Sequence, residues 1–254
     1  MARLRHAAVL LTGVSNRIGE ATAVAFARSG ARLALSARRF DRLQQVAQRC
    51  RAAGSPEVII CRADVSQPAE ARGFVEDGLS AFDRIDILIN NAAMGWYGRL
   101  QDMPEADLVR MLHTNLLAAM LTSQAALPAM LDARKGVILN VAAVAGFRAL
   151  PYSAAYSASK HALVGLSHAL RGELSGTGVK VCVVYPESSH PPAWVARAVL
   201  RTARWPRRDV IVAPYRAVQL LEPVLGGVLD QALGEICRAR NPSLRQAAPY
   251  DSRE

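Results

Sequence analysis

Short apolar runs alternate with longer amphipathic stretches along almost the whole chain. Seven runs have the length and the Val, Ile and Leu content of strands that are buried on both faces of a sheet. They cover residues 7–12, 31–37, 57–64, 85–92, 136–143, 179–186 and 209–214. Strands that alternate with helices in this way form a parallel sheet covered by helices.

The stretches between these runs have helical periodicity. We expect helices over residues 18–29, 40–54, 66–83, 104–133, 153–175 and 192–204. Gly30 follows the first of them, where a helix C-terminus favours glycine, and Pro128 marks a kink or break in the fourth. The whole pattern predicts an α/β fold, a doubly wound Rossmann-type domain with a parallel sheet of about seven strands.

No linker, internal repeat or low-complexity tract divides the 254 residues. One α/β domain reaches this length, so we expect a single domain over residues 1–254. Leu and Val at helical spacing predict extra C-terminal helices over residues 214–240. The polar residues 241–254 are expected to form a flexible tail.

The chain carries a net charge of +10, and most of its basic residues are arginine. Such a chain can bind nucleic acid or an anionic membrane. The arginines are spread along the length without a nucleic-acid-binding motif, so we expect no nucleic-acid partner. A positive stripe does occur on the last expected helix, at Arg197, Arg201, Arg204 and Arg208. Peripheral membrane contact is one interpretation of this stripe, and we favour the other, a solvated face on a helix that packs on the core.

The positions of the cysteines and histidines indicate the redox state of the cellular compartment and whether a metal site is expected. The four cysteines have no C-x-x-C spacing, and the chain has no signal segment or apolar run of membrane-spanning length. We therefore expect a reducing, cytoplasmic setting. The five histidines show no ligand spacing, so no metal site is expected.

The residues "TGVSNRIG" (12–19) separate the first expected strand from the first helix. At such a junction, backbone N–H groups and the helix dipole can hold a pyrophosphate; a purely structural turn is the alternative. The second strand ends in Arg38 and Arg39, with no acidic residue to accept the ribose hydroxyls of NAD. Two arginines there suit the 2′-phosphate of NADP(H), and we favour this over a solvated helix start.

Tyr156 and Lys160 lie four residues apart near the start of the helix expected over 153–175, so they share one face. A free tyrosine has a pKa of about 10, too high for ready proton exchange at neutral pH. A nearby ammonium and a cofactor pyridinium would lower the pKa of Tyr156 toward neutral. Tyr156 is then a candidate general acid and base.

Five ordered landmarks resemble the short-chain dehydrogenase/reductase family over roughly residues 5–215. They are Thr12-Gly13 with Gly19, Asp64-Val65, Asn90-Asn91-Ala92, Asn115, and Tyr156 with Lys160. The resemblance implies an NADP(H)-dependent oxidoreductase that transfers hydride between nicotinamide and a carbonyl or alcohol. It also implies that the apolar helices around 104–133 and 153–175 pair across subunits in a homodimer or homotetramer.

The resemblance also implies roles for individual residues. Tyr156, Lys160 and Asn115 are the catalytic set, with Asn115 supporting a water relay beneath the lysine. The expected cofactor-binding residues are Gly13, Ser15, Asn16, Arg17, Ile18, Gly19, Arg38, Arg39, Asp64, Val65, Asn91, Ala92, Tyr156, Lys160 and Pro186. The expected substrate-binding positions are Ala143, Ser153, Met94 and Trp96, and their aromatic and apolar surroundings suggest a lipophilic small molecule.

The chain departs from the family pattern at three places. Ala143 stands where the family keeps a serine hydroxyl, for which Ser153, Ser188 or Ser189 would have to substitute; as a helix N-cap, Ser153 also has a structural explanation. The segment after Pro186 is too short for a full substrate lid. Arg17 replaces a glycine and is expected to point outward toward the 2′-phosphate.

These departures leave two functions open. One is an oxidoreductase that is slow because it lacks the serine. The other is a catalytically impaired NADP(H)-binding pseudo-enzyme that acts as a sensor, partner subunit or scaffold.

Overall fold

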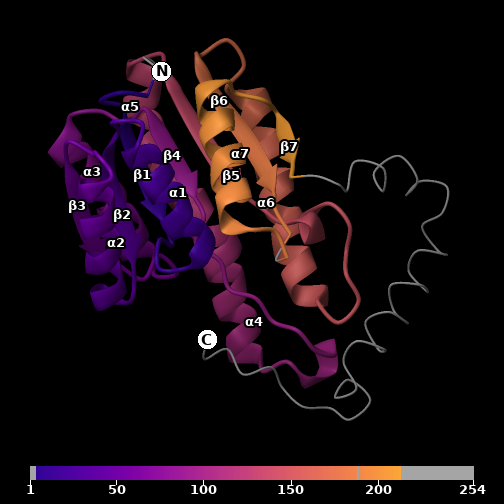
Figure 1. Cartoon of the computed structure of the whole chain (residues 1–254). Coiled ribbons are helices and arrows are strands. Elements are labelled where there is room, and N and C mark those ends of the chain that lie inside the picture. Colours follow the sequence, from indigo (N-terminus) through magenta and orange to yellow (C-terminus); the bar gives the residue numbers. More distant parts are fainter. Residues whose placement is uncertain (1–3, 188, 213–254) are drawn as a thin grey trace.

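The fold is organised around a seven-stranded sheet in which every strand is parallel to its neighbours. The computed structural model describes residues 4–187 and 189–212. The strands run in the order β3-β2-β1-β4-β5-β6-β7, with β3 and β7 at opposite edges (Figure 1). They are β1 (Ala8–Thr12), β2 (Arg32–Ala37), β3 (Val58–Arg62), β4 (Ile87–Asn90), β5 (Gly136–Val141), β6 (Val179–Tyr185) and β7 (Asp209–Ile211). This confirms the predicted doubly wound fold.

Two layers of helices cover the sheet, and each encloses its own apolar core. One layer consists of α1 (Arg17–Ala27), α2 (Phe40–Ala52) and α7 (Pro192–Arg204). The other consists of α3 (Pro68–Phe82), α5 (Ala118–Asp132) and α6 (Ala154–Glu173). The remaining helix, α4 (Glu105–Leu112), lies beyond the sheet, at the bottom of Figure 1.

The helix expected over 104–133 is interrupted, but Pro128 is not the cause. A π-helical turn, His113–Leu117, separates α4 from α5, and α5 continues through Pro128 without a break. A proline inside a helix removes a single N–H donor, and α5 tolerates this loss. The predicted break at Pro128 is therefore wrong. The real interruption places Asn115 in the π turn.

Several expectations lie outside the described residues, namely the C-terminal helices over 214–240, the tail over 241–254, and Ser188. Within the described ranges, no helix is long and apolar enough to cross a membrane. The same ranges contain no group of three His, Cys, Asp or Glu side chains that would hold a metal ion.

A polar lock joins the ends of β1 and β4. The Thr12 hydroxyl accepts the backbone N–H groups of Asn91 and Ala92, each at 3.1 Å. In return, the Asn91 side-chain amide donates to the backbone oxygens of Thr12 at 3.1 Å and Gly13 at 3.0 Å. These neighbouring strands lie where the strand order reverses, which is where α/β proteins bind ligands. The lock therefore sets the floor of that crevice.

A buried polar chain crosses the sheet beneath the α5–α6 layer. Thr122 donates to Asn90 at 2.7 Å, Asn90 to Asn140 at 2.9 Å, and Asn140 to Ser167 at 2.8 Å. Buried polar groups are costly unless they are bonded, so this chain restricts α5 and α6 to one register on β4 and β5. It thereby positions Lys160, which lies two turns before Ser167 on α6.

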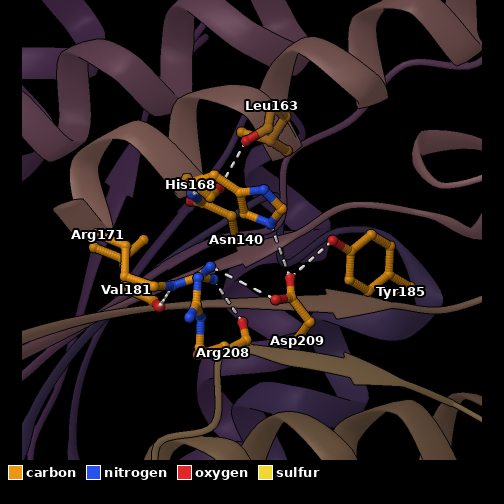
Figure 2. A network of polar contacts seen from close by, with 9 residues as sticks. Asn140, Leu163, His168, Arg171, Val181, Tyr185, Arg208 and Asp209 are labelled. Carbon is orange, nitrogen blue, oxygen red and sulfur yellow. Dashed lines mark hydrogen bonds and ion pairs between the residues drawn. The ribbon is translucent and has the colours of Figure 1, made fainter.

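The short edge strand β7 is held to α6 and β6 by one carboxylate (Figure 2). Asp209 accepts the Tyr185 hydroxyl at 2.9 Å and lies 3.2 Å from His168 Nε2 and 3.6 Å from Arg171 Nη1. Arg171 also donates to the backbone oxygen of Arg208 at 2.8 Å. These contacts fix a strand of only three residues and the turn that precedes it.

Candidate active site

A cleft of about 530 Å³ opens at the carboxyl ends of β1 to β4, above the polar lock. Its lining includes eight of the residues expected to bind a cofactor: Gly13, Ser15, Asn16, Arg38, Arg39, Asp64, Val65 and Ala92. Met94, expected on the substrate side, also lines it. Residues from four separate loops thus meet in one place, as the carboxyl ends of adjacent parallel strands require.

Two glycines let the backbone close up beneath the cleft. Gly13 has φ +70°, and a Cβ there would lie 2.6 Å from the Ala92 Cα. A Cβ on Gly19 would lie 2.3 Å from the Gly13 oxygen. Between them, Asn16 caps α1 by accepting the Gly19 N–H at 2.7 Å. The turn therefore presents the N-terminus of α1 at close range, which is the geometry that binds phosphate.

Arg38 and Arg39 place positive charge at the β2 end of the cleft. The Arg38 side chain is 64% exposed, and its Nη1 lies 3.9 Å from an Asp64 oxygen. Arg39 donates to the Ser15 backbone oxygen at 2.9 Å, bridging the β2 end to the glycine turn. The Ser66 hydroxyl donates a hydrogen bond to the other Asp64 oxygen at 2.7 Å. An exposed arginine side chain with such a long ion pair remains available to an anion.

Arg17 is exposed and points outward, as expected, but it does not line this cleft. It lines a separate groove between α1, α2 and α7, together with Arg42 and Arg197. The expected contact between Arg17 and a 2′-phosphate beside Arg38 therefore finds no support in the geometry. Ile18, Gly19 and Asn91 are also absent from the cleft lining; Gly19 and Asn91 are buried and support it from beneath.

The residues of the cleft fit a dinucleotide. Close backbone approach at Gly13, a capped helix N-terminus and two arginines supply space and positive charge where a pyrophosphate and a ribose phosphate need them.

Lys160 and Tyr156 lie together at the start of α6, one strand beyond the cleft. Lys160 is 1% exposed, and its ammonium donates to the Val141 backbone oxygen, at the end of β5, at 3.1 Å. The same nitrogen lies 5.8 Å from the centroid of the Tyr156 ring. Gly146 allows this arrangement, because a Cβ there would lie 2.8 Å from the Lys160 oxygen.

Burial governs the electrostatics of the pair. It raises the pKa of Tyr156 to about 12 and lowers the pKa of Lys160 to about 8. Desolvation is the cause of the raised tyrosine pKa in the protein without ligand. The predicted lowering requires a bound cofactor pyridinium and stays a prediction. At neutral pH, Tyr156 keeps its proton.

The side chain of Asn115 joins the loop after β4 to α6, and its expected support of a water relay stays a prediction. Its amide donates to the Met94 backbone oxygen and to the Ser159 hydroxyl, each at 2.9 Å, and its oxygen accepts the Met94 N–H at 2.7 Å. Ser159 in turn donates to the Tyr156 backbone oxygen at 2.7 Å. Because these bonds use both amide hydrogens, the side chain joins the β4 loop to α6, and it can take part in a water relay only through its main chain or its oxygen.

The expected substrate side is largely buried. Ala143, at the end of β5, is 8% exposed, and Trp96 is 7% exposed. Ser153 occupies the expected N-cap position of α6, but its side chain forms no capping hydrogen bond. Tyr152, with φ +63°, packs its ring 6.2 Å from that of Tyr97. Pro186 ends the strand next to β5, and its oxygen accepts the Val144 N–H at 2.9 Å.

Seven residues that line the cleft are not among the expected site residues, namely Ser36, Ala37, Ala63, Ala93, Gly95, Arg110 and Thr114. Arg110 on α4 and Thr114 in the π turn are one helical turn apart, and both face the cofactor-binding residues. Their spacing of four, just before Asn115, was a usable signal. Ser159 was also missed, and only its contact with Asn115 reveals its role.

The strand order and the cleft at its reversal point define a doubly wound α/β protein of the Rossmann type. The chain belongs to the short chain dehydrogenase family, whose family model matches residues 7–195.

Individual relatives show how close this relationship is. The chain is 41% identical over 179 residues to "11-beta-hydroxysteroid dehydrogenase-like 4A" of Arabidopsis thaliana, a match that covers 70% of this chain but only 59% of that protein. Among solved structures, it is similar to a metagenomic short-chain oxidoreductase in complex with NADP (33% identity, TM-score 0.79, 83% and 98% of the two chains). A Burkholderia phymatum short chain dehydrogenase/reductase in complex with NAD (23% identity, TM-score 0.84, 90% and 97%) shares the fold.

The buried ammonium of Lys160 predicts a specific pH dependence. Its pKa of about 8 lies below the ordinary 10.5, so folding disfavours the charged form, and the protein should gain stability as the pH rises from 8 to 10.5. Lys160→Met removes this gain. The difference in unfolding free energy between parent and variant should therefore change by about 3 kcal/mol across that window.

Urea unfolding at several pH values measures this difference, in which the effects of other titrating groups cancel. Lys180→Met is the matched control, because Lys180 is exposed on β6 and its difference from the parent should not depend on pH. A flat difference for Lys160→Met would show that the ammonium is solvated.

Proposed function

We propose that the protein is an NADP(H)-dependent oxidoreductase that transfers hydride between nicotinamide and a carbonyl or alcohol of a lipophilic small molecule. The observation that carries this proposal is the buried Lys160 bonded to the end of β5 beside Tyr156, one strand from a cleft that fits a dinucleotide. A buried lysine without a carboxylate partner is costly, and such perturbed groups cluster at functional sites.

The division of labour follows from the geometry. The cofactor, when bound, supplies or accepts the hydride. Tyr156 exchanges the proton at the substrate oxygen, and its raised pKa keeps it in the proton-donating form that a reduction needs. Lys160 provides positive charge beneath the ring, and Asn115 with Ser159 holds the start of α6 in place.

The cofactor preference rests on the arginines. Arg38 lines the cleft with its side chain mostly exposed, and no described acidic side chain replaces the ribose-binding carboxylate at the end of β2. The NADP complex of the metagenomic relative supports the same choice. The proposed lipophilic substrate is supported by the aromatic side chains of Trp96, Tyr97 and Tyr152 and by the hydroxysteroid dehydrogenase name of the plant relative.

A pseudo-enzyme is the second candidate, favoured by Ala143. The end of β5 offers no hydroxyl to a substrate oxygen. Of the serines that would have to replace it, Ser153 is 8% exposed, Ser189 is exposed, and Ser188 lies outside the described residues. Pro191, where the short segment after Pro186 meets α7, is consistent with a reduced substrate lid. In that case the protein binds NADP(H) and acts as a sensor, partner subunit or scaffold.

We also propose a cytoplasmic setting, supported by the free thiols of Cys50, Cys61 and Cys182. Burial raises the pKa of Cys50 and Cys61 to about 12 and that of Cys182 to about 11, so all three are unreactive structural thiols.

Cofactor choice provides the first test. Arg38→Ala should weaken NADPH binding at least ten-fold, because a charge-assisted contact to the 2′-phosphate is lost, and should leave NADH binding nearly unchanged. Dissociation constants for both nucleotides, from fluorescence titration, measure the effect. Arg17→Ala is the matched control, since Arg17 lines a different groove. Equal affinity of the parent for the two nucleotides would refute the role given to Arg38.

Assembly provides the second test, since we propose a homodimer or homotetramer built on α4, α5 and α6. Val109, Leu112 and Met120 form an exposed apolar stripe along α4 and α5, each 38% to 43% exposed. On α6, a Cβ at Gly165 or Gly172 would meet no atom within 4 Å, so a second helix can approach closely.

Met120→Glu would place a charge in this interface and should yield monomers, as measured by light scattering at micromolar concentration. Phe40→Glu is the control, because Phe40 is 41% exposed but lies on α2, on the other face of the sheet. A monomeric parent would remove the proposal.

Restoring the missing hydroxyl provides the third test. Ala143→Ser adds one oxygen at the extended end of β5, and we expect kcat for carbonyl reduction to rise roughly ten-fold, less than a full oxyanion-hole donor is worth. Tyr156→Phe should abolish activity in both backgrounds.

The outcome separates the two candidate functions. If parent and serine variant both bind NADPH but show no turnover, the pseudo-enzyme is correct. If the parent is fast and the serine variant slower, another group already contacts the substrate oxygen.

A further inference from the structure

Two tryptophans are exposed on the outer face of α7, and one of them, Trp205, has the Arg204 guanidinium 5.2 Å from its ring centroid. Trp194 is 56% exposed and Trp205, directly after the helix, is 55% exposed, whereas Trp96 is 7% exposed. The inner face of α7 supplies the core contacts through Val195 and Val199, both fully buried. An exposed indole gives up much of the free energy that its burial would provide. This placement therefore suggests a partner.

Arginines lie between these tryptophans. Trp194, Arg197, Arg201 and Trp205 follow at spacings of three, four and four, so they form one stripe along the helix. All four line a shallow hollow of about 290 Å³, which Arg207 completes. We call these five residues the α7 outer face.

The charge of this face is not neutralised by described residues. Arg197, Arg201 and Arg207 form no ion pair within the described ranges. The acidic residue that lines the hollow, Asp209, is already engaged by Arg171 and Tyr185 (Figure 2). Three guanidinium groups are thus available to an anionic partner.

We propose that the α7 outer face docks on an anionic phospholipid surface. Indole rings favour the boundary between lipid headgroups and hydrocarbon, and arginines bind lipid phosphates there. The two tryptophans are eleven residues apart, which is about 16 Å along a helix. One aromatic anchor in the first turn of α7 and one directly after its end, with cations between them, match an extended anionic surface.

Other partners fit this face less well. A second copy of the chain related by two-fold symmetry would bring the same arginines against each other, which is unfavourable. A single-stranded nucleic acid stacks neighbouring bases on closely spaced aromatic rings, whereas these rings stand at opposite ends of the helix. Among the described residues that line the hollow there is no Asn or Gln side chain that would read base edges.

Docking through this face would orient the protein. α7 begins seven residues after β6 ends, so Trp194 lies toward the carboxyl ends of the strands, where the cleft opens. Because Trp205 anchors the opposite end, a lipid-bound α7 would lie along the membrane surface, with the β7 edge of the sheet beside it.

Vesicle flotation of the full-length protein tests the proposal. Vesicles of phosphatidylcholine mixed with phosphatidylglycerol should bind the protein, vesicles of phosphatidylcholine alone should not, and high salt should release it. Binding should also shift the tryptophan emission to shorter wavelength. The double variant Trp194→Ala/Trp205→Ala should lose binding, and Arg201→Gln should lower the partition coefficient about five-fold.

Arg72→Gln is the matched control, because Arg72 is equally exposed but lies on α3, on the opposite face of the sheet; its binding should equal the parent's. Only variants whose melting temperature equals the parent's are compared, so that loss of binding does not reflect unfolding. Carbonyl reduction or NADPH binding should be unchanged in all of them. The proposal is overturned if binding does not depend on phosphatidylglycerol, or if Arg72→Gln weakens it as much as Arg201→Gln. It is also overturned if Arg201→Gln changes the oligomeric mass, or if a single-stranded oligonucleotide binds more tightly than the vesicles.

Discussion

The hydrogen bonds between Thr12 and Asn91 are the contacts on which the rest of the site depends. One hydroxyl and one amide close the ends of β1 and β4 against each other, and the glycine turn rests on that closure. Gly13 reaches its conformation because Ala92 lies directly beneath it, with no room for a Cβ. The cleft, the N-terminus of α1 and the position of Arg39 over Ser15 all follow from this junction.

Further hydrogen bonds fix the position of the start of α6 relative to the sheet. The chain from Asn90 through Asn140 to Ser167 sets the register of the helix, and the bond from Asn115 to Ser159 ties its first turns to the β4 loop. Lys160 is then held with its ammonium on a backbone oxygen, out of reach of water. Burial makes the lysine a weaker base and the tyrosine a weaker acid than in water.

The α7 helix has one face buried in the core and another face exposed at the surface. Its buried residues pack on α1 and the sheet, while its outer residues are free of the fold's demands. The network around Asp209 holds the neighbouring edge strand, although that strand has only three residues (Figure 2). These contacts hold β7 beside α7, so both elements contribute to the same surface hollow.

The sequence by itself determined the strands, most of the helices and the loops that would meet at the cleft. These depend on local periodicity and on a parallel topology in which carboxyl ends share one edge, both of which are visible in the order of residues. The tertiary structure alone decided which groove Arg17 lines, the interruption at His113–Leu117 rather than Pro128, and the burial that raises the Tyr156 pKa in the protein without ligand. Each of these depends on which atoms from distant segments surround a side chain and exclude water from it, and spacing along the chain carries no information about that.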